Sequence, residues 1–339
     1  MRQNIKKLLY SSGFYHTVAK QLRLNKIGVL CYHGLTAKDS EAVNHIPNAF
    51  LHTPIKEFEL QMKFISEAFN VLTLTKLWEH FTRRRELPSN SVLITFDDGY
   101  KTIYRLAKPV LEKYNIQPVI FITTENIGKY DLIWPDAVFL YYQDRTIPSK
   151  QFPDGYTANP KISSSPSQMD EEAIYDIIRW LKKVKNQKRL EFLNRIMSKP
   201  DFISRIPQEC LVLNEDEIFQ LSSLGFNIGS HTNSHSILSR MSAEEQENEI
   251  ALSKKILEEI TSKPVCSFAY PEGGAHDFND VTIQLLKKHN YTSAFTTIEG
   301  YDGKDENLYK LKRIFVMGNL PIWEFCHRMV FSWPATYIR

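Results

Sequence analysis

The sequence predicts an α/β fold built around a parallel sheet. Seven short apolar runs recur along the 339 residues, and helical patterns separate most of them, which is the order expected when helices join parallel strands. Ionisable or loop-forming residues follow four of these runs where each strand ends, as they do in α/β barrels. An open, flavodoxin-like sheet would satisfy the same pattern, so barrel and open sheet remain alternatives at this point.

The expected strands are short apolar runs at residues 28–31, 92–96, 119–123, 226–230, 265–269, 292–296 and 313–316. Helix signals lie between them. Thr53-Pro54 predicts a helix start, with Thr53 as the N-cap and proline in the first turn. The apolar face of that helix consists of Phe58, Met62, Ile65 and Phe69. The sequence Ser-Ala-Glu-Glu at 242–245 predicts a capping box that opens another helix.

Two adjacent acids end the run at 92–96. Asp97 and Asp98 stand at the end of an expected buried strand, and Gly99 allows a tight turn behind them. Neighbouring carboxylates repel each other unless a cation lies beside them, so the pair favours a cation site. Taken alone, the residues are explained equally well by a solvated Asp-Gly turn.

Two histidines follow the run at 226–230. His231 and His235 are four residues apart, which would place them on one face of a helical turn and suits two imidazoles that bind one metal ion. Two surface histidines on a loop would give the same spacing. Together with one aspartate from the first pair, they would form a three-ligand site with an open fourth position, which is typical of catalytic zinc.

Two further ionisable residues lie at expected strands. His33 follows the run at 28–31, and Arg313 opens the run at 313–316. A core histidine and a surface charge at a strand start are the plain alternatives for these two positions. A loop shaped by proline and glycine, at 270–274, follows the run at 265–269.

With these motifs in this order, the chain resembles the polysaccharide deacetylase family, whose shared unit is the NodB homology domain. The resemblance rests on residues 95–100 (Thr-Phe-Asp-Asp-Gly-Tyr), 230–235 (Ser-His-Thr-Asn-Ser-His) and 268–273 (Phe-Ala-Tyr-Pro-Glu-Gly). It extends from about residue 26 to residue 316 and is interrupted at about 130–208. The family's fold, a distorted (β/α)7 barrel, matches the count of seven expected strands.

The resemblance implies a role for each matched residue. Asp98, His231 and His235 would hold one divalent ion, zinc or another transition metal, and Asp97 would be the general base. The Phe-Ala-Tyr-Pro form and the early Tyr-His pair are similar to the branch that contains bacterial poly-N-acetylglucosamine deacetylases. In that branch the general acid comes from the Tyr-His segment, which here supplies His33.

Two positions depart from the family pattern, and one further group is expected to act in the site. Many members carry an arginine in the third motif, where this chain has Ala269, so Arg313 is the candidate replacement that would orient Asp97. Glu272 stands where an aromatic residue is usual, and it would narrow or charge the substrate groove. The backbone N–H of Tyr100 would stabilise the tetrahedral oxyanion.

The segment at about 130–208 is expected to be a helical insertion. Residues 160–167 are rich in Ser and Pro and predict a loop, and two helices are expected at 169–184 and 188–197. The insertion would cover the active site as a cap, because specificity in barrels usually depends on loops after strands. Aromatic residues that could stack on sugar rings, although packing is their commoner use, are Trp134, Tyr141 and Tyr142.

Composition narrows the class of protein. A net charge of +3 and a pI of about 8.5 are too mild to indicate a nucleic-acid partner. The chain has no run near the ~20 apolar residues of a membrane span and no apolar region of signal-peptide length, which predicts a cytoplasmic location. The sequence defines no oligomeric state. The four cysteines show no paired spacing and are expected to be free thiols: Cys31, Cys210, Cys266 and Cys326.

The expected organisation is an N-terminal helical segment at 1–25 followed by the barrel at 26–339. Within the first segment, a helix over 5–22 would allow weak contact with a membrane surface.

These observations predict a metal-dependent hydrolase that removes N-acetyl groups from an amino-sugar-containing glycan or glycan precursor. Asp97 would be the base, His33 the acid, with His276 as the next candidate, and a metal-bound water the nucleophile. One alternative is a catalytically dead carbohydrate-binding relative, which the intact set of site residues argues against. Another is an amidohydrolase of a small non-sugar amide, which a narrow pocket closed by the insertion would favour over an open groove.

Overall fold

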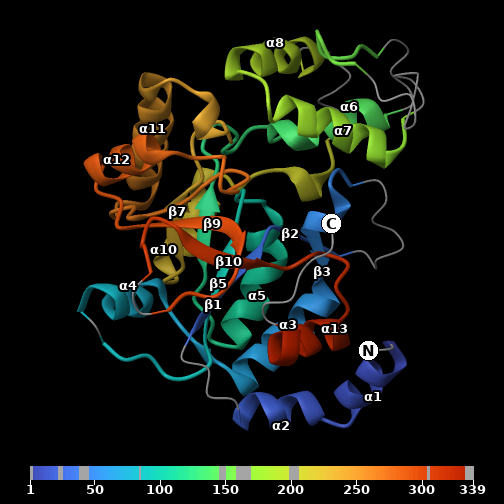
Figure 1. Cartoon of the computed structure of the whole chain (residues 1–339), viewed down its shortest axis with the longest axis vertical. Coiled ribbons are helices and arrows are strands. Elements are labelled where there is room, and N and C mark those ends of the chain that lie inside the picture. Colours follow the sequence, from blue (N-terminus) through green and yellow to red (C-terminus); the bar gives the residue numbers. More distant parts are fainter. Residues whose placement is uncertain are drawn as a thin grey trace.

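Seven parallel strands close into a barrel, so the open sheet is excluded (Figure 1). The computed structural model describes residues 3–21, 26–37, 46–83, 85–144, 150–157, 169–197, 206–303 and 306–332. The ring closes because β1 pairs with both β5 and β10. Its strands are β1 (Ile27–Tyr32), β5 (Ser91–Phe96), β6 (Val119–Ile122), β7 (Asn227–Ser230), β8 (Ser267–Ala269), β9 (Ser293–Glu299) and β10 (Leu311–Phe315). The short strand β4 (Asn70–Val71) pairs with the first half of β5.

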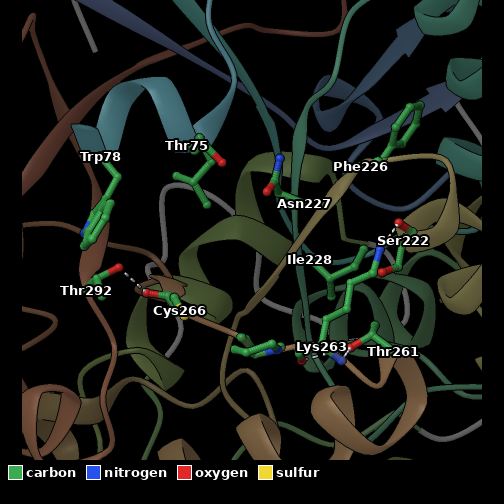
Figure 2. A pocket seen from close by; sticks show the side chains of 14 residues that line it. Thr75, Trp78, Ser222, Phe226, Asn227, Ile228, Thr261, Lys263, Cys266 and Thr292 are labelled. Atoms are coloured by element: carbon green, nitrogen blue, oxygen red, sulfur yellow. Dashed lines mark hydrogen bonds between the residues drawn. The ribbon is translucent and has the colours of Figure 1, made fainter. Parts of the chain in front are cut away.

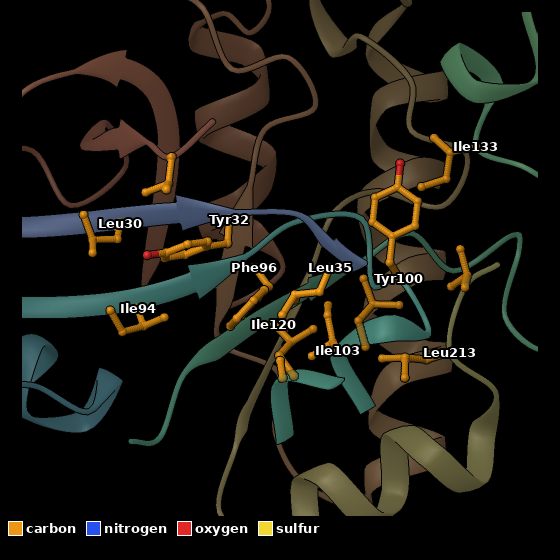
Figure 3. Close-up of a cluster of buried hydrophobic side chains, with 14 of the residues drawn as sticks. Leu30, Tyr32, Leu35, Ile94, Phe96, Tyr100, Ile103, Ile120, Ile133 and Leu213 are labelled. Atoms are coloured by element: carbon orange, nitrogen blue, oxygen red, sulfur yellow. The ribbon is translucent and has the colours of Figure 1, made fainter. Parts of the chain in front are cut away.

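Side chains alternate between the inside and the outside of the barrel. Val29 and Leu93 belong to a small buried cluster that also contains Phe121 of β6 and Phe295 of β9, whose ring centroids are 5.3 Å apart although these strands are not neighbours. This cluster therefore fills the barrel. The intervening residues of the strands, such as Leu30, Tyr32, Ile94 and Phe96, belong to the larger cluster under the surrounding helices (Figure 3). By the same alternation, His33 and Asp97 continue the inward-facing rows at the carboxyl ends of β1 and β5.

Helices cover the outside of the barrel: α3 (Ile55–Ala68), α5 (Lys108–Lys113), α10 (Glu215–Ser223), α11 (Ala243–Thr261) and α12 (Asp280–Lys288). Helix α4 (Leu74–Arg83) instead covers the end of the barrel where the strands begin, because its Leu77 belongs to the cluster inside the barrel. The capping box predicted at the start of α11 is confirmed, with Ser242 and Glu245 bonded to each other's backbone N–H groups. The predicted Thr53 N-cap is wrong, because Thr53 lies in β3 (His52–Pro54), which pairs with β2 (Gly34–Thr36). Pro54 takes the N-cap position of α3 without a side-chain bond.

Two helices precede the barrel among the described residues 3–21, in place of the single helix expected over 5–22. They are α1 (Gln3–Ser11) and α2 (Phe14–Gln21), separated at Gly13, whose φ is +73°. A 2.6 Å ion pair between Lys6 and Glu324 joins α1 to α13 (Ile322–His327), which follows the last barrel strand. Among the described residues, no helix is both long and apolar enough to span a bilayer.

The described part of the insertion contributes three helices, α6 (Trp134–Gln143), α7 (Glu171–Leu181) and α8 (Asn186–Met197), which lie together at one end of the molecule (Figure 1). The last two confirm the helices predicted at 169–184 and 188–197, whereas the loop predicted at 160–167 lies outside the described residues. Helix α6 was not predicted. The aromatic side chains that could have stacked on sugar rings are buried in packing contacts instead, which contradicts a stacking role. They are Trp134, Tyr141 and Tyr142.

Candidate active site

The two aspartates enter the barrel mouth through a turn with unusual backbone angles. Asp97 ends the inward row of β5, and Asp98 and Gly99 then adopt left-handed φ values of +71° and +74°. A Cβ at Gly99 would lie 2.9 Å from Cγ2 of Ile122, so only glycine fits against β6 there. This turn brings the Asp98 side chain into the same pocket as Asp97, and both are buried.

Asp97 is held by a buried two-pronged ion pair. The Arg313 Nη1 and Nη2 atoms donate to Oδ1 and Oδ2 of Asp97, each at 2.6 Å, and Arg313 Nε donates to the carbonyl of Thr296 at 2.7 Å. The predicted contact between Arg313 and Asp97 is thus confirmed. The expectation that Arg313 opens its strand is wrong, since it is the third residue of β10. Burial would raise the pKa of Asp97, but the Arg313 guanidinium brings that pKa below its ordinary value.

Asp98 faces two imidazoles. Its Oδ1 atom lies 3.4 Å from Nε2 of His231 and 3.3 Å from Nε2 of His235, yet this buried oxygen has no hydrogen-bond partner in the described part of the protein. The ring of His231 is oriented by its Nδ1 atom, which lies 2.8 Å from the carbonyl oxygen of Ala269. With Nδ1 as the donor, Nε2 keeps a lone pair directed at the site. An unpaired buried carboxylate oxygen beside two imidazole nitrogens fits a bound divalent cation.

The histidines lie on a loop after β7, so the prediction that they share a helical turn is wrong. Thr232 and His235 both have left-handed φ values, +66° and +55°, and this geometry brings the two imidazole centroids to 5.0 Å. Glu249 of α11 holds the loop from one side: its carboxylate accepts from the backbone N–H groups of Asn233 and Ser234, each at 2.8 Å. Sequence reasoning missed Glu249, since a single acid inside a helix carries no signal of this contact.

His33 lies at the end of β1 and lines the same pocket as both aspartates. Its ring centroid is 5.2 Å from that of Phe315, and Nδ1 is buried without a partner among the described residues. Burial lowers the pKa of His33, although Asp98 and Asp97 oppose this effect. The fallback acid His276 is exposed and does not line the pocket, so that alternative is contradicted.

Tyr100 has two distinct contributions. Its hydroxyl donates to Oδ2 of Asp136 at 2.7 Å, and Asn48 Nδ2 donates to the other oxygen of Asp136 at 2.5 Å. Its backbone N–H donates to no acceptor from the described part of the chain. Asp136, on insertion helix α6, was not predicted; burial raises its pKa to about 7.

The pocket around these groups has a volume of about 300 Å³, and both the barrel and the insertion line it. Ile133, Tyr175 and Lys182 come from the insertion, and Lys182 forms a 2.6 Å ion pair with Glu272 at the rim of the barrel. Glu272 therefore brings a negative charge to the pocket, as the sequence suggested, and the positive charge of Lys182 balances it.

Two other features compare less well as active sites. A cavity of about 440 Å³ lies where β7, β8 and β9 begin, at the opposite end of the barrel (Figure 2), and its Lys263 already donates to the carbonyl of Ser222. A second group of candidate metal ligands, Cys31, His33 and Asp97, is buried beside the first. It is poorly suited to a cation, because Arg313 already occupies both carboxylate oxygens of Asp97.

Comparison with known proteins connects this pocket to one family. A family model described as polysaccharide deacetylase matches residues 84–294, more than half of the chain. The Bacillus subtilis protein YxkH, whose name assigns it to the polysaccharide deacetylases, is 23% identical over 293 residues, which cover 86% of this chain and 71% of YxkH. A poly-β-1,6-N-acetyl-D-glucosamine N-deacetylase of Staphylococcus aureus is 39% identical over 74 residues, 22% of this chain and only 25% of that enzyme.

Solved structures show the same fold. The deacetylase PplD of Streptococcus pyogenes, solved in complex with acetate, has a TM-score of 0.59 at 19% identity and covers 91% of this chain and 99% of its own. IcaB from Ammonifex degensii has a TM-score of 0.58 at 16% identity, with 91% and 98% covered. At these identities the similarity concerns the arrangement of the barrel and its surrounding helices.

Proposed function

Because the chain belongs to the polysaccharide deacetylase family, we propose that it is a metal-dependent hydrolase that removes N-acetyl groups from an amino-sugar-containing glycan or glycan precursor. The observation that carries this proposal is the buried, unpaired Oδ1 of Asp98 between two imidazoles, directly beside the Asp97–Arg313 pair. Acid, base and cation ligands are thus within one pocket.

The cation would be held by Asp98, His231 and His235. Two imidazoles and one carboxylate suit Zn²⁺, although cobalt or nickel could take its place by ligand preference. When bound, such an ion supplies Lewis-acid chemistry, which makes water a better nucleophile and stabilises negative charge on oxygen. The hydrogen bond from His231 to the Ala269 carbonyl would keep its Nε2 free for the ion.

The protein's own groups would move the protons. Asp97, fixed in one rotamer by Arg313, takes a proton from water as the water oxygen forms a bond to the acetyl carbon. The Tyr100 N–H would donate to the oxygen on which negative charge develops. The C–N bond then breaks, and protonated His33 gives its proton to the leaving nitrogen. The products are acetate and a free amino sugar.

The lowered pKa of His33 has two effects on this step. It makes the protonated ring a stronger acid, but it also reduces the protonated fraction at neutral pH. The enzyme is therefore expected to work best on the acidic side of neutrality.

Acetate release from a panel of N-acetylated sugars, with and without chelator, tests the proposal. Activity that chelator removes and added Zn²⁺ restores would support it. Protein with bound metal that releases neither acetate nor free amine from any substrate would instead identify a catalytically dead carbohydrate-binding relative.

A second candidate, an amidohydrolase of a small non-sugar amide, is favoured by one observation. The pocket is compact, at the lower end of the ~300–1,000 Å³ usual for ligand sites, and insertion residues form part of its wall. Simple N-acetyl amides in the same panel separate the two, since hydrolysis of these alone, with N-acetyl sugars untouched, would favour the small amide.

A further inference from the structure

The insertion contacts the loop that carries the metal-binding histidines. Trp134 of α6 donates its Nε1–H to the carbonyl oxygen of His235 at 3.0 Å. Arg189 of α8 donates from Nη2 to Oγ of Ser236, the next residue, at 3.2 Å. Two helices of the insertion therefore bind two consecutive residues of this loop. These contacts are distinct from the insertion's contribution to the pocket wall.

We propose that Trp134 and Arg189 are positioning residues for the metal site, so that the insertion sets the affinity for the metal ion as well as covering the substrate pocket. This inference rests on the proposed function only in that the ion is taken to bind at Asp98, His231 and His235. It concerns metal affinity, which can be measured without any substrate.

The two residues form one unit. The guanidinium carbon of Arg189 lies 4.9 Å from the centroid of the Trp134 ring, and both side chains are almost fully buried, at 1% and 4% exposure. Arg189 Nη2 also donates to Oδ1 of Asn186 on its own helix. A shift of either side chain would disturb the other, because the guanidinium of Arg189 packs against the face of the Trp134 ring in a cation–π contact.

Burial of the Arg189 side chain is unfavourable for folding. Its Nε and Nη1 atoms are buried without hydrogen-bond partners in the described structure. Burial lowers the pKa of Arg189 to about 10, although the charges of Glu249 and Glu272 oppose this effect, and burial of the guanidinium opposes folding. A residue used only for packing could be apolar at less cost. The contact to Ser236 is what an apolar residue could not supply.

The loop needs such support because its backbone is strained. His235 has a φ of +55°, a left-handed value that a non-glycine residue adopts only when its surroundings enforce it. Ser236 Oγ lies 2.7 Å from Ser234 Oγ, which in turn donates to Glu249 at 2.7 Å. The loop is therefore held between α11 of the barrel on one side and the insertion on the other. Release of one side would let His235 relax away from Asp98.

Conservative variants test this without removing the core. Trp134→Phe keeps a ring beside Arg189 and deletes the bond to His235. Arg189→Met keeps a long, unbranched side chain and deletes the donor to Ser236, and Ser236→Ala removes the acceptor for Arg189. Each is expected to weaken metal binding by about 10–100-fold, the range seen when groups behind metal ligands are changed. Tyr142→Phe is the matched control, because Tyr142 is equally buried in the insertion and its hydroxyl donates to the carbonyl of Gln151 instead of to the histidine loop.

The measurements are the dissociation constant for Zn²⁺ by chelator competition, the visible absorption spectrum of the Co²⁺ form, and urea unfolding of the metal-free protein. We expect weaker binding and an altered Co²⁺ spectrum in the three variants but not in the control. The double variant of Trp134 and Arg189 should lose less affinity than the two single losses combined, because both act on one loop.

Metal affinity within twofold of wild type in the folded variants would overturn the inference. Failure of all three to fold would also overturn it, since it would assign these residues to the core alone. Neither result depends on deacetylation. An active deacetylase with unchanged metal affinity in the variants would refute only this inference, whereas tight metal binding without acetate release would refute only the proposed function.

Discussion

Replacement of Arg313 by lysine tests the central ion pair of the site. Lysine keeps the positive charge but has one nitrogen in place of the fork that meets both oxygens of Asp97 at 2.6 Å. It also loses the Nε–H that donates to the carbonyl of Thr296. The Arg313→Lys variant thus changes geometry and hydrogen bonding more than charge.

The magnitude follows from those contacts. A hydrogen bond to a charged group contributes about 1.5–3 kcal/mol, so loss of one prong and of the Thr296 contact should cost about 3–6 kcal/mol of unfolding free energy. The freed Asp97 carboxylate can rotate, and a misplacement of about 1 Å can lower turnover by about 10²-fold. The metal ligands keep their contacts, so metal content should not change.

The assay combines acetate release at saturating substrate, urea unfolding and elemental analysis on the same preparation. Arg195→Lys is the matched control, because Arg195 meets both oxygens of Asp154 at 3.4 Å on the exposed surface of the insertion. It should leave turnover unchanged. Wild-type turnover in Arg313→Lys would refute the reasoning, since lysine cannot reproduce the planar fork that is assumed to orient the base.

Four further variants address the remaining groups. His231→Ala should lose both metal and activity, because it removes one of three ligands; stoichiometric metal by elemental analysis would contradict the assignment. Asp97→Asn should keep the metal and lose about 10²-fold or more in turnover, as expected for a removed base. His33→Ala should lose turnover and the alkaline limb of the pH–rate profile, whose wild-type midpoint should lie below pH 6.5; unchanged turnover would move the acid elsewhere. Asp136 has a pKa raised from 3.8 to about 7, so folding favours its protonated form and the metal-free protein should lose up to about 4 kcal/mol of stability as pH rises from 4 to 7. Urea unfolding at pH 5 and 8 should show a smaller loss in Asp136→Asn, and equal pH dependence in both proteins would argue against a buried, neutral acid.

The barrel could be predicted because its signals are local and repeated. Apolar runs with ionisable ends locate the strands, and period-two alternation then places residues such as Asp97 inside the mouth. The partner Arg313 could be anticipated because a buried carboxylate needs a cation and the usual position holds Ala269. The roles of these residues in catalysis stay predictions until the variants are measured.

The missed features depend on how distant segments pack. Helix α6 is apolar on nearly all sides, with eight buried residues, so no amphipathic pattern marks it. The histidine loop depends on left-handed φ angles at Thr232 and His235, and the sequence around these residues did not predict them. Asp136 and Glu249 are single acids inside helices, and only the docking of α6 and α11 brings them to the site.

The Asp97–Arg313 pair also bears on the order in which the chain can assemble. The two residues are 216 positions apart, and Arg313 lies on β10, the last strand to be synthesised, which closes the ring against β1. Until β10 docks, the carboxylate of Asp97 must stay hydrated or protonated, because a buried charge without its partner is strongly unfavourable. A nascent chain cut off before β10 would therefore keep an open, wet barrel mouth. Closure of the barrel and formation of the Asp97–Arg313 pair are one event, so a partly made protein should lack the oriented carboxylate that we propose as the base.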